Sequence, residues 1–76
     1  MARPLYEIAK EIKADWKNPY FGAVPYMNAM QDLNTVQDNY ILDSGKSIVL
    51  YFLANAQTWR GEVARRVKKE LNGMVK

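Results

Sequence analysis

The sequence contains no cysteine and no histidine among its 76 residues. Without cysteine there is no disulfide scaffold, and a zinc site built from carboxylates alone has a poor ligand set. The same two absences remove the thiolate nucleophile and the imidazole base, so the common catalytic pairs of enzymes cannot be assembled. We therefore expect no enzymatic activity, no metal site, no cofactor and no small-molecule substrate.

Long apolar runs are also missing. The longest is Ile48–Ala54, which covers about a third of the roughly 20 residues that a membrane-spanning helix needs. The first residues carry charges at Arg3 and Glu7 and contain no apolar signal core. These features predict a cytoplasmic protein that does not bind membranes.

What is present is enough for one small folded unit. Hydrophobic residues make up 49% of the chain and aromatic residues 12%, which predicts a folded rather than a disordered protein. A chain this short has room for a single domain over residues 1–76, and its stability must come from close packing or from self-association.

Apolar periodicity and turn signals predict four helical segments. The first carries an apolar stripe at helical spacing, and Asn18-Pro19 ends it. The expected segments are Pro4 to Trp16, Pro25 to Asn34, Lys46 to Gln57, and Thr58, as an N-cap, to Asn72-Gly73. Gly61 is either an unfavourable helix residue or the mark of the turn.

The third segment leaves helix and strand open over residues 47–57, because Ile48–Leu53 is apolar on every side and rich in strand formers. We favour a helix, since no second strand is evident. The predicted fold is all-α, a compact bundle of three to four short helices around a central apolar helix. Residues 35–45 form a loop that Val36, Tyr40, Ile41 and Leu42 hold against the core.

Asp43-Ser44-Gly45-Lys46-Ser47 ends like a phosphate-binding P-loop. That motif requires a glycine five positions before its Gly-Lys pair, where this chain has Tyr40. The segment is therefore interpreted as the first turn of a helix capped by Ser44.

Positive charge gathers in the C-terminal part of the chain. Residues 1–45 hold four basic and six acidic side chains, a net charge of −2, whereas residues 46–76 hold seven basic and two acidic side chains, a net charge of +5. The last helix resembles the second helix of a helix-turn-helix, which would contact DNA phosphates. The alternative is a solvated face with Glu62–Arg66 and Arg66–Glu70 pairs. The candidate residues are Arg60, Arg65, Arg66, Lys68 and Lys69.

Trp16, Tyr20 and Phe21 lie in an aromatic connector after the first helix. Aromatic side chains in a loop can anchor a protein interface or stack on single-stranded nucleic acid. In a small helical domain they can equally well plug the end of the bundle.

Three stretches carry a resemblance to known sequences: residues 3–9 (RPLYEIA), 20–26 (YFGAVPY) and 43–61. They resemble a group of small uncharacterised proteins of bacterial phages and integrative mobile elements. The resemblance implies a context in which such genes often encode DNA-associated factors or small inhibitors of host proteins.

Two functions follow as hypotheses. In the first, the protein is a non-enzymatic binding module whose basic C-terminal helix contacts double-stranded DNA. In the second, it is a protein–protein interaction module, either a phage-type inhibitor of a host protein or a small homo-oligomer, since a short chain cannot easily bury so many large apolar residues.

Overall fold

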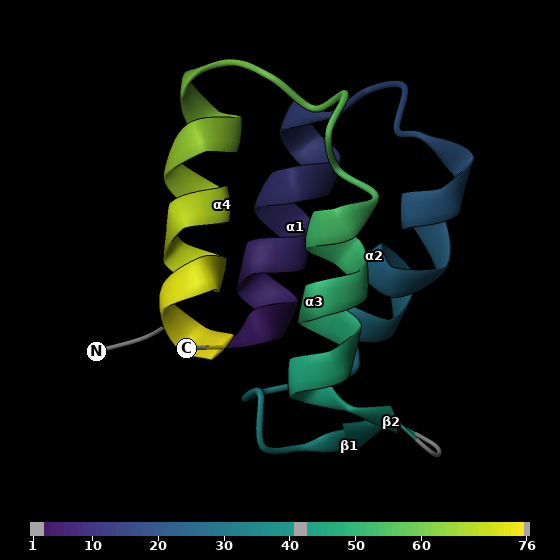
Figure 1. The fold of residues 1–76 in the computed structure, drawn as a ribbon, viewed down its shortest axis with the longest axis vertical. Coiled ribbons are helices and arrows are strands. Elements are labelled where there is room, and N and C mark those ends of the chain that lie inside the picture. The colour runs from purple at the N-terminus through teal and green to yellow at the C-terminus, as the bar shows by residue number, and fades with distance from the viewer. Residues whose placement is uncertain (1–2, 41–42, 76) are drawn as a thin grey trace.

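A computed structural model describes residues 3–40 and 43–75 of the chain. Figure 1 shows a bundle of helices with a short hairpin at one end. The helices are α1 (Leu5–Asp15), the short 3₁₀ helix η1 (Phe21–Ala23), α2 (Val24–Met30), α3 (Gly45–Ala54) and α4 (Glu62–Val75). The four predicted helical segments are confirmed, with different ends.

The apolar stripe of α1 is buried as its spacing predicts, because Leu5, Ile8, Ala9 and Ile12 all face the core. The helix has no capping side chain at its start. Instead the backbone N–H groups of Leu5 and Tyr6 donate to the carbonyls of Asn34 and Leu33, at 2.8 and 3.0 Å. The end of the α2 region therefore supplies the acceptors that the first turn of α1 needs.

The all-α prediction is wrong in one detail, because β1 (Asn39–Tyr40) and β2 (Asp43–Ser44) form a two-stranded antiparallel hairpin beside the start of α3 (Figure 1). The turn before it is ordered by the Asp38 carboxylate, which accepts the N–H groups of Asn34 and Thr35. Val36 and Tyr40 pack against the core as predicted. Ile41 and Leu42 lie outside the described residues.

The third segment is a helix, and Ser44 caps it by accepting the N–H of Ser47 at 3.2 Å. The prediction of a central helix buried on every side is wrong. Leu50 and Tyr51 are 46% and 49% exposed. The reason is that α3 packs against α2 on one side and α4 on the other, which leaves its outer side without a covering element.

The last helix begins at Glu62 rather than at Thr58, and Gly61 marks the turn. Gly61 has a φ of +114°, a conformation that only glycine adopts easily. Trp59 is therefore a loop residue, although its side chain is buried. Gly73 does not end the helix, which continues to Val75.

The core lies between two pairs of helices, because α1 and α3 each pack against both α2 and α4. The end of the core nearest the α3–α4 loop is aromatic. Trp16 and Trp59 stack with ring centroids 5.7 Å apart, and Phe52 meets both rings edge-on at 6.3 Å. The first connector and the α3–α4 loop are thus held by the same cluster.

Candidate functional site

The P-loop-like segment does not form a phosphate site. The N–H groups of Gly45 and Lys46 donate to the carbonyls of Asp38 and Val36, at 2.6 and 2.8 Å, and that of Ser47 donates to the Ser44 hydroxyl. A phosphate-binding loop needs such N–H groups free to cradle the ligand. The interpretation as a capped helix start is confirmed.

The aromatic connector divides into two parts. Trp16 is 8% exposed and plugs the bundle end, as one of the alternatives predicted, so it is not available as an interface anchor. Tyr20 and Phe21 point outwards, and Phe21 is 78% exposed. A cleft of about 250 Å³ lies between Tyr20 and the loop residues Asn55, Gln57 and Thr58, and no charged side chain lines it.

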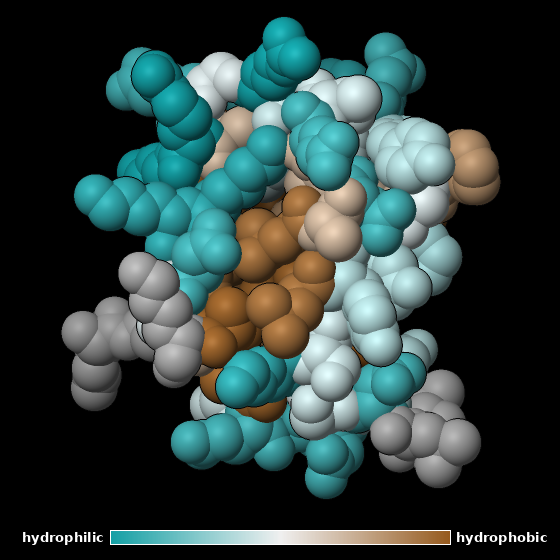
Figure 2. All heavy atoms as spheres, viewed as in Figure 1, coloured by the Kyte–Doolittle hydropathy of each residue, from teal (hydrophilic) through white to brown (hydrophobic). Residues whose placement is uncertain are grey.

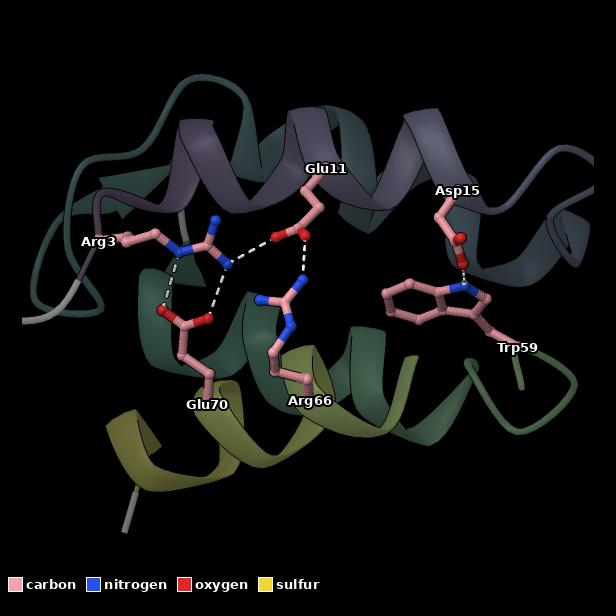
Figure 3. A network of polar contacts seen from close by, with 6 residues as sticks. All are labelled: Arg3, Glu11, Asp15, Trp59, Arg66 and Glu70. Atoms are coloured by element: carbon pink, nitrogen blue, oxygen red, sulfur yellow. Dashed lines mark hydrogen bonds and ion pairs between the residues drawn. The ribbon is translucent and has the colours of Figure 1, made fainter. Parts of the chain in front are cut away.

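Four charged side chains form a network between α1 and α4, seen in Figure 3. Arg3 Nε and Nη2 donate to the two carboxylate oxygens of Glu70 at 3.1 and 2.7 Å, a bidentate pair. Arg3 Nη2 also lies 2.8 Å from Glu11 Oε1, and Arg66 pairs with Glu11 Oε2. Arg66, one of the predicted binding residues, is therefore engaged within the protein.

This network changes the charge of one side of α4. The hydrogen bond from Arg66, assisted by Arg3, holds the pKa of Glu11 below its usual value, although partial burial acts in the opposite direction. The pKa of the Arg3 guanidinium is raised, chiefly by its hydrogen bond with Glu70. Two cations and two carboxylates cancel here, so the α1 side of α4 does not present net positive charge.

Lys68 is held on the opposite side of α4. Its Nζ donates to the Trp59 carbonyl at 2.6 Å and lies 5.9 Å from the centroid of the Trp59 ring. Burial and the nearby charge of Arg60 lower the pKa of Lys68. This lysine is both a support for the α3–α4 loop and part of a group of closely spaced cations.

The other three predicted residues, Arg60, Arg65 and Lys69, are exposed. None of them forms an ion pair with any residue that the structure describes. Arg65 and Lys68 are three positions apart on α4 and so share one row of the helix surface. The sequence thus placed Arg65, Arg66, Lys68 and Lys69 correctly on one helix, whereas Arg60, which was expected on the same helix, lies in the loop before it. The structure separates the neutralised Arg66 from the cations on the other side of α4.

Apolar side chains gather on the surface between α3 and α4, as the brown area of Figure 2 shows. Helix geometry identifies its partly exposed members. Tyr51 contacts Tyr26 of α2, with ring centroids 5.4 Å apart, so the other flank of α3, with Leu50 and Leu53, faces α4. Arg66 and Glu70 face α1, so the flank of α4 that carries Lys68 and Val75 faces α3.

We call this surface the basic–apolar face; it consists of Lys46, Leu50 and Leu53 on α3, Arg60 in the loop, and Arg65, Lys68 and Val75 on α4. Lys46, Leu50 and Leu53 have the i, i+4, i+7 spacing of one helix face. No aspartate or glutamate occurs between residues 45 and 61. Leu50, Leu53 and Val75 could not be identified as surface residues from the sequence, because an apolar run on a helix does not show which side remains uncovered.

The geometry differs from a helix-turn-helix. That motif joins two helices at about 90–120° through a turn of three or four residues. Here residues 55–61 separate α3 from α4, a loop of seven residues, and the two helices run antiparallel, side by side (Figure 1). The helix-turn-helix arrangement expected from the sequence is not formed.

Comparison with models of protein families, with curated proteins and with solved structures finds no match. In the part of the chain that the structure describes, every helix is too short or too polar to cross a membrane. Nor do three potential metal-binding side chains come together among the residues described.

Proposed function

We propose that the protein is a non-enzymatic module that binds another protein through the basic–apolar face. The observation that carries the proposal is the exposure of Leu50 and its neighbours on α3 beside a row of cations on α4. An exposed apolar area rimmed by charged side chains is typical of a protein interface, where burial of the apolar part drives binding. The cations then select the partner.

Contact with DNA phosphates is the competing function. It is supported by the exposed cations Arg60, Arg65 and Lys69, which have no acidic partner among the described residues. Two observations weigh against it. Interfaces with DNA are more polar and more positively charged than those between proteins, whereas this face centres on Leu50 and Leu53. In addition, α4 begins with Glu62, an acidic residue at the end that a recognition helix would insert.

A second copy of the chain is a poorer partner than a different protein. Pairing two basic–apolar faces would bring Lys46, Arg60, Arg65 and Lys68 of one copy close to the same cations of the other. Like charges within an interface oppose association. The charge pattern therefore favours a partner that carries carboxylates.

The proposal is tested by comparing capture of bacterial proteins by the wild type, by Leu50→Asp and by Phe21→Asp, each checked for folding by circular dichroism. We expect a protein that the wild type and Phe21→Asp retain after nuclease treatment and that Leu50→Asp loses. Capture that disappears with nuclease would support DNA binding instead. Equal capture by all three proteins would contradict a role for the basic–apolar face.

A further inference from the structure

We infer that the partner segment is an acidic amphipathic helix, which lies along the boundary between α3 and α4 with its carboxylates on the α4 side. This inference rests on the proposed function and specifies its ligand. It is carried by the shape of the surface, by the placement of its charges and by the absence of carboxylates along α3.

The shape of the face suits a helix. Its apolar residues run along the line where two antiparallel helices meet, the place where a further helix packs in a bundle. From Arg65 to Val75, α4 extends about 15 Å at the helical rise of 1.5 Å per residue. A partner helix of three to four turns would cover that length, and its i, i+3, i+4, i+7 apolar stripe would bury Leu50 and Leu53.

The charges of the basic–apolar face determine which residues should border the apolar stripe of the partner helix. Lys46 lies at one end of the face and Arg60 at the other, and Arg65 and Lys68 line the α4 side between them. No carboxylate occurs from Gly45 to Gly61, and Glu70 is turned away towards Arg3. Between the two ends of the face, the cations therefore lie only on the α4 side, so a partner with glutamates on only one border of its apolar stripe binds in one direction.

An anionic partner would also relieve the repulsion between cations on the α4 side of the face. Burial lowers the pKa of Lys68, and repulsion from the positive charge of Arg60 lowers it further. A carboxylate between them would replace this repulsion with two attractions. Because Lys68 is partly buried against Trp59, such a contact would be screened less by salt than one between fully exposed side chains.

The test uses three synthetic 15-residue helical peptides of one design. The first has a leucine stripe with glutamates along one border, the second has lysines in place of the glutamates, and the third has serines in place of the leucines. Isothermal titration calorimetry at low salt measures their affinity for the wild-type protein. We expect the first peptide to bind at least about tenfold more tightly than either of the others.

Matched protein variants locate the site. Leu50→Ser and Arg65→Glu should each weaken binding of the first peptide by about tenfold. Phe21→Ser and Lys13→Glu change an exposed apolar residue and an exposed cation elsewhere and should have little effect. Equal binding of the glutamate and lysine peptides, or equal loss in the two control variants, would overturn the inference.

The outcomes also separate this inference from the proposed function. If a captured protein depends on Leu50 but the acidic peptide does not bind, the acidic-helix inference fails and the protein-binding proposal stands. If a DNA duplex displaces no peptide and gives no shift at low salt, DNA binding is excluded. If sedimentation shows a dimer that Leu50→Ser converts to a monomer, a second copy covers the face and both proposals fail.

Discussion

The indole Nε1 of Trp59 donates a hydrogen bond of 2.8 Å to the Oδ2 of Asp15, 44 positions earlier in the chain (Figure 3). The bond joins the α3–α4 loop to the end of α1. The Trp59 ring also stacks on Trp16, and the backbone carbonyl of Trp59 accepts a hydrogen bond from Lys68. One loop residue therefore connects α1, α4 and the aromatic end of the core.

A double-mutant cycle should detect this bond. Trp59→Phe and Asp15→Ala each remove one partner, and we expect a coupling free energy of about 1 kcal/mol in urea denaturation. The coupling is modest because Asp15 is exposed, so water can take the place of the missing partner in a single variant. Asp32→Ala, another exposed aspartate, should show no coupling with Trp59→Phe. Strictly additive effects of Trp59→Phe and Asp15→Ala would contradict the bond.

The two glycines at the ends of α4 should respond in opposite ways to alanine. Gly61→Ala forces an alanine into a φ of +114° and should cost about 1 kcal/mol or more of unfolding free energy. Gly73→Ala should stabilise by about 0.5–1 kcal/mol, because Gly73 is helical and a Cβ there meets no atom within 4 Å. Thermal denaturation of both variants measures the two effects. A Gly61→Ala protein as stable as the wild type would contradict the positive φ of Gly61 in the turn before α4.

The two phenylalanines should differ strongly in their contribution to stability. Phe52 is completely buried between Trp16 and Trp59, so Phe52→Ala should lower the unfolding free energy by about 3–5 kcal/mol. Phe21→Ala should change it by less than about 0.5 kcal/mol, since the ring is mostly exposed. Similar destabilisation by both substitutions would contradict the placement of Phe21 outside the core.

Acid should weaken the α1–α4 network. The pKa of Glu11 is lowered in the folded protein from 4.5 by Arg66 and Arg3, so its ionised form stabilises the fold above that pH. This contribution is lost as the pH falls below about 4.5 and through the lower folded-state pKa. Denaturation at several pH values should therefore show a smaller acid-dependent loss of stability in Glu11→Gln than in the wild type.

Glu7→Gln is the matched control for the pH series. Glu7 lies one turn before Glu11 on α1, is exposed, and forms no ion pair among the residues that the structure describes. Its substitution should leave the acid-dependent loss of stability close to that of the wild type. The role of Glu11 would be refuted if the two variants had the same pH profile.

Local signals in the sequence determined the helices. The stripe of α1, the capping Ser44 and the breaker Asn18-Pro19 act through neighbouring backbone and side-chain groups, so their effects can be read over a few residues. The sequence also predicted that residues 43–47 do not form a P-loop, because Tyr40 occupies a position where that motif requires glycine. The hairpin was missed because strands of two residues show no alternating pattern, and the start of α4 was placed early because Thr58 resembles an N-cap.

The make-up of the basic–apolar face was decided by tertiary structure. The sequence placed Arg65, Arg66 and Lys68 on one helix, but only packing brought Glu11 to Arg66 and Arg3 to Glu70 and left the other side positive. The apolar run of α3 likewise determined a helix without determining which flank the other helices would cover. Ion pairing and exposure depend on residues distant in the chain, so sequence alone gives the charges and apolar groups, and the fold decides which of them remain available to a partner.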